Sequence, residues 1–379
     1  MTGPGAPLIS VVLPVGNVAD FLPACLDSVF GEPGQPGGDL EVIAVDDASS
    51  DGCGHILDTR AGRDPRLRVI HLTESAGPGP ARMRGLAEAA GTYVWFVDPD
   101  DLLAGGALAA VTGRLASCRP DVLLIDYLIR RRSGDYLIRR RSGRTEPSPG
   151  AALLAVPPAA AATLTLAERP ALINRTMTAW SKVFRREFLT GLRVFFPPGI
   201  HEDVQVSCAA LLSAERIALL DRVCYVYRRR RHSFLATTSM AHFSIFPAYE
   251  SVFALMDAGG NSGAPGGPGG QAAPAGPRLP RVSAAVRAAV FGRAIEHYST
   301  ILAKGLVPRR GRREFFHRMA ADYRRYRPAG YQRPPGLRAM KFALIERGAY
   351  GAYRVLGPLN NARAAMARAW PPRRVQPAR

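Results

Sequence analysis

The first 100 residues alternate short apolar runs with stretches of helical spacing. Between the first two runs, apolar side chains recur at helical spacing from Phe21 to Phe30, and residues 80–90 predict a second helix that Gly91 ends. Strand–helix–strand alternation predicts a parallel, doubly wound α/β sheet, which binds ligands beyond the carboxyl ends of its strands. The runs that we interpret as buried strands are residues 8–13, 40–45, 67–72 and 93–97.

Carboxylates gather at the ends of two of these predicted strands. Asp98, Asp100 and Asp101 directly follow an apolar run. Clustered carboxylates repel one another unless a cation neutralises them, and oxygen ligands select hard ions, so the cluster indicates Mg or Mn bridging a pyrophosphate. A polar turn that caps the next helix is the alternative. Asp46 and Asp47 end the neighbouring strand, where they either accept hydrogen bonds from a base or ribose or form an Asx turn.

Two later motifs also allow two interpretations each. Glu202 and Asp203 begin a helical run, where carboxylates are favoured by the helix dipole, so they are either capping residues or a general base. The basic run YVYRRRRHS, from Tyr225 to Ser233, is either a solvated face or a set of contacts to an anionic leaving group or acceptor.

A nonapeptide, DYLIRRRSG, occurs twice in tandem at residues 126–134 and 135–143. Two copies cannot form a solenoid, which needs at least three. The duplication begins within the end of a predicted strand at 121–129, so it predicts either a longer basic hairpin or loop, or an arginine-rich lip near an anionic substrate. The register stays open, because either copy could continue the strand.

Seven segments, taken in order and spacing, resemble the family-2 glycosyltransferases over about residues 7–235. They are PLISVVLPVGN, LEVIAVDDASSDG, PARMRG, GTYVWFVDPDD, TAWSKVFRREFL, GIHEDV and YVYRRRRHS. The resemblance implies an α/β fold of GT-A (Rossmann-like) type, with a mostly parallel sheet flanked by helices and followed by a basic helical C-terminal extension. Similar bacterial enzymes assemble teichoic acids or surface polysaccharides.

The resemblance also implies a role for each matching position. Asp47 would contact the nucleotide base, Asp203 would be the catalytic base with Glu202 beside it, and Asp100 and Asp101 would hold the metal, Mg or Mn. Acceptor or phosphate contacts would come from Lys182, Arg228 and His232. The donor-binding set would be Pro14, Val15, Asn17, Asp46, Asp47, Arg82, Arg84, Asp98 and Asp100.

Two positions depart from the family pattern. Gly16 stands where an aromatic side chain usually helps to enclose the base, and Met83 replaces the usual Asn of the A-R-N-R-G stretch. Base affinity and nucleotide identity are therefore open. The expected activity is metal-dependent, inverting transfer of a hexosyl or N-acetylhexosaminyl group from a nucleotide sugar, UDP-linked by resemblance. The acceptor would be a glycan, polyol-phosphate or lipid-linked precursor of a cell-surface polymer. The alternative is a catalytically weak or inactive GT-A-like scaffold that docks through its basic tail to a membrane or an anionic polymer.

The net charge of +19 is concentrated near the C-terminus. Residues 281–379 hold 22 Lys and Arg against 4 Asp and Glu, whereas residues 1–280 hold 28 against 27. We divide the chain into a GT-A domain at 1–257, a Gly/Pro-rich linker at 258–280 and a basic helical region at 281–379. Such a region predicts an anionic partner surface. Nucleic acid is not expected, because no RRM, KH or zinc-finger pattern is present.

The basic region also suggests where the protein acts. Its arginines alternate with Phe315, Phe316, Tyr323 and Tyr326, a composition that lets a helix lie on an anionic bilayer. Five scattered cysteines suit a reducing compartment. We therefore expect a cytoplasmic protein, peripheral on the inner face of the cell membrane.

Overall fold

The computed structural model describes residues 6–31, 40–130, 136–139, 163–175, 177–229, 237–258 and 282–356, with backbone only at 136–139. The chain divides into two compact units. One comprises Met1–Thr237 and Pro247–Ala289, and the other comprises Thr238–Phe246 and Val290–Arg379. The predicted linker at 258–280 lies outside the described residues, apart from Ala258, so the predicted domain boundaries stay a prediction.

The strands of the first unit form one mixed sheet. Their bounds are β1 Ile9–Val15, β2 Leu40–Asp46, β3 Leu67–His71, β4 Tyr93–Phe96, β5 Leu102–Leu103, β6 Val122–Arg130, β7 Tyr136–Arg139, β8 Lys182–Arg185 and β9 Ile217–Arg228. In the part of the chain that is described, the nine strands have the order β3-β2-β1-β4-β8-β6-β9-β5, with β7 beside β6. β1 to β4 are parallel neighbours, as the alternation predicts. β8 then runs antiparallel to both β4 and β6, which makes the sheet mixed.

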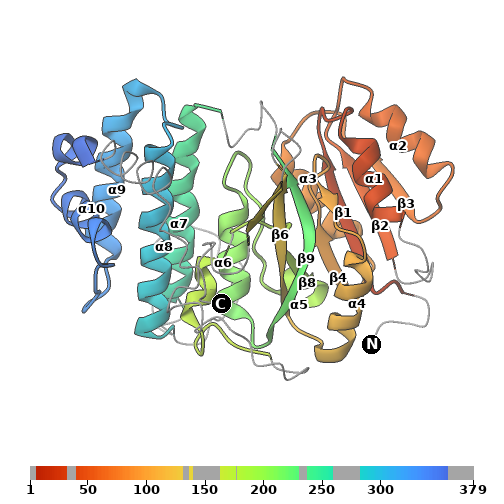
Figure 1. The fold of residues 1–379 in the computed structure, drawn as a ribbon. Helices are drawn as coiled ribbons and strands as arrows, with labels where there is room; N and C mark the ends of the chain where they lie inside the picture. The colour runs from red at the N-terminus through yellow and green to blue at the C-terminus, as the bar shows by residue number, and fades with distance from the viewer. Residues whose placement is uncertain are drawn as a thin grey trace, which may run out of the picture. The chain divides into compact units, whose positions relative to one another are not determined.

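Helices cover both faces of the parallel strands. Side chains at alternate positions of a strand point to opposite faces. Ile9, Val11 and Leu13 of β1 belong to one buried cluster with apolar residues of α1 and α4, whereas Val12 lies against α3. Figure 1 shows α1, α2 and β1–β3 in red to orange at one end of this sheet. The helices are α1 Leu22–Phe30, α2 Cys53–Ala61, α3 Pro78–Glu88, α4 Ala107–Cys118, α5 Arg186–Gly191, α6 Asp203–Ser213, α7 Ile245–Ala258, α8 Ala284–Ala303, α9 Arg312–Tyr326 and α10 Leu337–Glu346.

Helix α3 lies unusually close to the sheet because of Gly85. A Cβ atom at this position would be 2.4 Å from Cγ1 of Val12, closer than real side chains approach. Glycine therefore lets the helix backbone rest directly on β1. This contact sets the distance between α3 and the sheet. It therefore also sets the position of Arg82, which lies one helical turn before Gly85.

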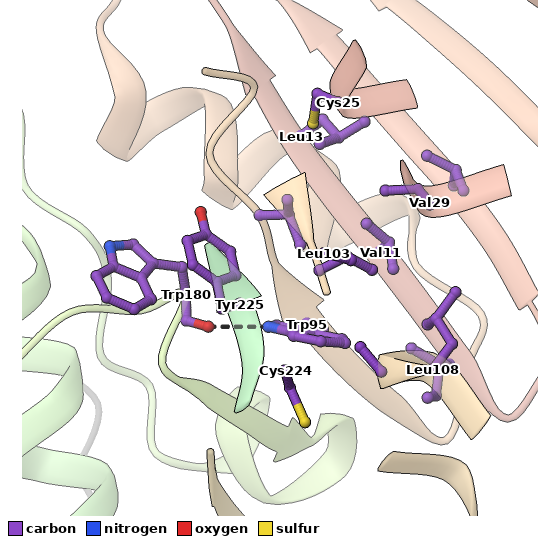
Figure 2. Close-up of a cluster of buried hydrophobic side chains, with 14 of the residues drawn as sticks. Val11, Leu13, Cys25, Val29, Trp95, Leu103, Leu108, Trp180, Cys224 and Tyr225 are labelled. Carbon is purple, nitrogen blue, oxygen red and sulfur yellow. Dashed lines mark hydrogen bonds between the residues drawn. The ribbon is translucent and has the colours of Figure 1, made fainter. Parts of the chain in front are cut away.

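Aromatic side chains from three sequence motifs pack against one another in the core, beneath the carboxyl edge of the sheet. Trp95 Nε1 donates a hydrogen bond to the carbonyl oxygen of Trp180 at 2.9 Å, as Figure 2 shows. The ring of Tyr225 stacks on Trp180 with centroids 4.5 Å apart and planes 11° apart, and Tyr127 packs edge-on at 4.7 Å. The motifs containing Trp95, Trp180 and Tyr225 are thus held in one core.

The tandem repeat forms the hairpin that its sequence predicts. The first copy continues strand β6, and the second supplies β7, which pairs with it in antiparallel register. Tyr127 is opposite Arg139, and Arg130 is opposite Tyr136. The residues between the two strands, 131–135, lie outside the described part of the chain.

The second unit contains helices, and three of the four aromatic side chains named in α9 face its interior, whereas Tyr326 is half-buried. Phe315, Phe316 and Tyr323 of α9 are completely buried, and Phe315 packs on Phe246 at 4.7 Å. The expectation that these rings could contact a bilayer is therefore wrong, because they form the core of this unit. None of the helices in the described ranges is long and apolar enough to span a membrane.

Candidate functional site

A single guanidinium joins three of the sequence motifs at the carboxyl edge of the sheet. Arg82 of α3 donates from Nη2 to Asp98 Oδ1 at 2.7 Å. From Nη1 it donates to Glu202 Oε1 at 2.6 Å and to Asp203 Oδ1 at 3.2 Å. Its side chain is only 4% exposed. The PARMRG, VDPDD and HEDV motifs therefore meet at one point, although more than 100 residues separate the first from the last.

Asp203 has the electrostatic environment of a proton acceptor. Burial raises the pKa of its carboxyl to about 7, with Glu202 and Asp98 adding to the rise and Arg82 opposing it. The side chain is still 15% exposed. A carboxylate with a pKa near neutral is mostly ionised at slightly alkaline pH, yet basic enough to take a proton from a hydroxyl.

Helix capping does not account for Glu202 and Asp203. α6 begins at Asp203, and the side chain of Glu202, its N-cap residue, makes no capping hydrogen bond. Instead both carboxylates point to Arg82. The preceding His201 has a left-handed backbone with φ of 66°, which is costly for a residue with a side chain. The turn before α6 thus directs two acids into the site.

The VDPDD turn after β4 brings three carboxylates together. Asp98, Asp100 and Asp101 each offer an oxygen atom within 4.8 Å of the others. Asp101 is completely buried, with Oδ2 accepting from the hydroxyl of Tyr225 at 2.8 Å and Oδ1 accepting from the backbone N–H of Arg228 at 2.7 Å. Burial, together with Asp100 and Asp98, raises the pKa of Asp101 well above its usual value. These oxygens fit a hard divalent cation such as Mg or Mn.

Tyr225 is a site residue that the sequence reasoning missed. Besides donating to Asp101, its hydroxyl accepts from the backbone N–H of Asp98 at 3.1 Å, so it fixes both ends of the turn. The signal was present, since Tyr225 lies in the quoted YVYRRRRHS segment. However, its role depends on the pairing of β5 with β9, which joins residues over 100 positions apart.

The side chain of Arg228 binds backbone carbonyl groups of the same turn. Its Nε donates to the carbonyl of Asp100 at 2.5 Å, and its Nη2 donates to that of Phe21 at 2.9 Å. The guanidinium also lies over the ring of Phe21, 5.1 Å from its centroid. In this structure Arg228 therefore ties the VDPDD turn to the loop between β1 and α1. Its predicted contact with a phosphate or acceptor stays a prediction.

The two aspartates at the end of β2 have separate tasks. Asp47 accepts from Ser75 Oγ, Ala76 N and Gly77 N at 2.8, 2.7 and 2.9 Å, and so orders the loop that enters α3. Asp46 Oδ2 lies 3.0 Å from Nδ1 of His71. Both carboxylates therefore make hydrogen bonds to neighbouring residues at this strand end. Their contacts with the donor stay predictions.

The loop after β1 completes this edge of the sheet. Pro14 and Val15 are buried, and the carbonyl of Val15 accepts from the N–H of Asp47 at 2.7 Å. Asn17 Oδ1 accepts from the N–H of Ser50 at 3.0 Å, which joins the loops after β1 and β2. Gly16, which lies between Val15 and Asn17, is exposed. A Cβ atom at this position would be 3.9 Å from Asp47 Cβ.

Of the other predicted site residues, two have partners elsewhere and the third lies outside the described residues. Arg84 is half-exposed on α3 and pairs with Glu88 at 3.0 Å. Lys182 is completely buried, where its Nζ donates to the carbonyl of Thr178 at 2.9 Å. His232 lies outside the described residues.

Part of the chain is similar in sequence to known glycosyltransferases. The family model described as "Glycosyl transferase family 2" matches residues 10–162. The uncharacterized glycosyltransferase EpsJ of Bacillus subtilis is 30% identical over 238 residues, which cover 60% of this chain and 62% of EpsJ. A poly(ribitol-phosphate) beta-glucosyltransferase of Bacillus spizizenii is 40% identical over 101 residues, covering 26% of this chain and 16% of that protein. The chain thus spans less than two thirds of these curated relatives.

The overall fold is shared with a solved structure. Residues 1–349 of S. aureus TarS, in complex with UDP-GlcNAc, superpose with a TM-score of 0.66 at 18% sequence identity, covering 93% of this chain and 91% of that one. This likeness confirms the predicted GT-A-like fold. Together with the family match, it confirms the resemblance drawn from the motifs: residues 10–162 match the glycosyl transferase family 2 model, and the fold is GT-A-like.

Proposed function

We propose that this protein is an inverting glycosyltransferase that moves a sugar from a UDP-linked donor to a hydroxyl of a cell-surface polymer precursor. The observation that carries the proposal is the junction at Arg82, which places a carboxylate with a pKa of about 7 beside the VDPDD turn. The family match and the structures of TarS with UDP-GlcNAc and with UDP support this choice of donor. An inactive scaffold is not favoured, because it would need neither feature.

The donor would bind at the carboxyl edge of β1, β2 and β4. Asp98, Asp100 and Asp101 would hold Mg or Mn, which stabilises negative charge on a departing diphosphate when it is bound. The nucleoside would lie near Gly16 and Asn17, where the loops after β1 and β2 are tied together. Arg228 would keep the carboxylate turn fixed against this loop.

Asp203 would act on the acceptor. Its carboxylate would take the proton of the acceptor hydroxyl as that oxygen attacks the anomeric carbon. The new carbon–oxygen bond would form on the face opposite the diphosphate, while the bond between sugar and phosphate breaks. The electron pair of that bond would leave with the diphosphate, and the sugar would invert its configuration.

Asp203→Asn tests the assignment of the base. The variant should bind UDP as the parent does but lose transfer by about 10²–10⁴-fold, the usual contribution of positioned proton transfer. Binding is measured by calorimetry, and transfer by UDP release with a panel of UDP-sugars. Asp221→Asn, which changes an exposed aspartate of β9, is the matched control. Parental turnover by Asp203→Asn would show that another group is the base.

We propose that the arginines of the second unit attract the protein to an anionic acceptor or membrane surface by charge alone. Arg309, Arg310 and Arg313 are exposed, whereas the neighbouring rings are buried. Attraction between exposed charges is screened by salt, so binding to vesicles of anionic lipid should fall steeply with ionic strength. Replacing these three arginines by Gln should weaken flotation more than replacing Arg60, Arg63 and Arg68. Equal effects of the two triple variants would reject this surface.

A further inference from the structure

We propose that Arg82 is a positioning residue that holds the base Asp203 in register with the VDPDD turn, and that it does not contact the donor. The inference rests on the proposed function, but it departs from the donor-binding role that the family resemblance implies for this arginine. It starts from one geometric fact. A single guanidinium binds Asp98 on one side and both Glu202 and Asp203 on the other.

The guanidinium of Arg82 is nearly enclosed, since its side chain is 4% exposed. Nη1 and Nη2 already donate to carboxylates, and Nε is buried without a hydrogen-bond partner. The ring of Phe196 lies 5.5 Å from the guanidinium carbon and covers one face of the group. A donor phosphate would therefore have to displace this ring or one of three charged partners. A buried guanidinium already bound to carboxylates on both of its terminal nitrogens is a cross-link between them.

The helix that carries Arg82 is itself held against the parts that the arginine joins. Gly85 rests on Val12 of β1, as described above. At the other end of the helix, a Cβ atom on Gly79 would lie 2.5 Å from the carbonyl oxygen of Pro197. Pro197 belongs to the segment that leads into Glu202 and Asp203. Two glycines therefore bring α3 into close contact with β1, the neighbour of β4 in the sheet, and with the segment before Glu202 and Asp203.

Loss of this cross-link should change catalysis more than donor binding. Without the guanidinium, Asp98 repels Glu202 and Asp203, and α6 can shift relative to the VDPDD turn. A displacement of about 1 Å at a reacting group can cost about 100-fold in rate. The donor should still bind, because Arg82 makes no contact with it.

The test compares Arg82→Gln with Arg82→Lys in the full-length protein. For Arg82→Gln we expect UDP affinity and donor KM within about threefold of the parent, and kcat lower by about 100-fold. Arg82→Lys keeps the charge but not the fork of donors, so it should regain part of kcat. If the Gln variant fails to fold, the same comparison of kcat with UDP affinity is made on the Lys variant. Arg60→Gln, which breaks an exposed pair with Asp27, is the control.

The opposite division of effects would overturn the proposal. A loss of UDP affinity of tenfold or more, with kcat retained, would make Arg82 a donor contact. A second readout needs no activity: Arg82→Gln, Glu202→Gln and the double variant are compared by urea unfolding. Coupled residues give non-additive changes, so additive changes would also reject the cross-link. Absence of transfer by the parent protein with every sugar donor would instead count against the proposed function, and the unfolding cycle would still decide the role of Arg82.

Discussion

The pH dependence of transfer should follow the ionisation of Asp203. A general base works only when it is deprotonated, so activity should rise as the pH increases through the pKa of this carboxyl, about 7. With that value, roughly 9% of the protein has an ionised base at pH 6 and about 91% at pH 8. We therefore expect kcat/KM to rise about tenfold across this interval.

Glu202→Gln should move this profile toward acid. Glu202 and Asp203 both lie within hydrogen-bond distance of the same Arg82 nitrogen, so their oxygens are at most about 6 Å apart. Two unit charges at that distance repel by about 3 kcal/mol at an effective dielectric constant of about 20. Because both side chains are partly exposed, we halve this figure, to about 1.4 kcal/mol. The midpoint should therefore fall by about one pH unit.

The assay is kcat/KM for UDP release, measured from pH 5.5 to 9 at constant ionic strength. Only the midpoints of the two pH profiles are compared, because the substitution can also lower the maximal kcat/KM. Glu187→Gln removes the same charge from an exposed position on α5 and should leave the midpoint in place. A midpoint that does not move in Glu202→Gln, or that moves toward alkaline pH, would refute the electrostatic account of the base.

Three further predictions concern the glycines and the carboxylate turn. Gly16→Tyr should raise UDP affinity about tenfold, which corresponds to about 1.4 kcal/mol from stacking of the ring on the base. A side chain fits at this position, because a Cβ atom would make only an ordinary contact with Asp47. Unchanged affinity by calorimetry would contradict this prediction. Gly85→Ala should lower the free energy of unfolding by about 1–3 kcal/mol through its clash with Val12, whereas Gly113→Ala, with no atom near its Cβ, should be neutral or stabilising in urea. Chelation should abolish transfer, Mg or Mn should restore it, and Asp100→Asn should weaken this metal dependence, measured as the ion concentration giving half-maximal rate.

Three strands of the first 100 residues, β1, β2 and β4, could be predicted because they are buried on both faces. The prediction that residues 67–72 form a buried strand was wrong in its burial, because only Leu67 of β3 is buried. A strand covered by helices on each side must be apolar throughout, so its sequence is a short unbroken run. Residues 8–13 and 93–97 have this form, and they become β1 and β4 within one or two residues. The antiparallel position of β8 between β4 and β6 leaves no such local signal, because it depends on pairing between distant segments.

The same limit applies to the site. Sequence motifs predicted functional roles for Asp98, Asp203 and Arg82, but they could not predict the hydrogen bonds among these side chains. Whether a basic side chain faces a ligand or the protein depends on what packs around it. Lys182 and Arg228 illustrate this, since both donate to backbone carbonyls. Amphipathic spacing likewise could not tell whether the aromatic face of α9 meets lipid or other helices.

The tandem repeat shows how tertiary contacts settle a register that the sequence leaves open. Both copies contain the same strand-forming residues, so local propensity cannot choose which of them continues β6. The first copy also pairs with β9, with Tyr127 opposite Tyr225 and Ile129 opposite Tyr227. The second copy gains its pairing from the first alone among the described strands. Because antiparallel pairing places Tyr127 opposite Arg139 and Arg130 opposite Tyr136, the two copies make equivalent cross-strand pairs, and the second copy extends the sheet beside β6.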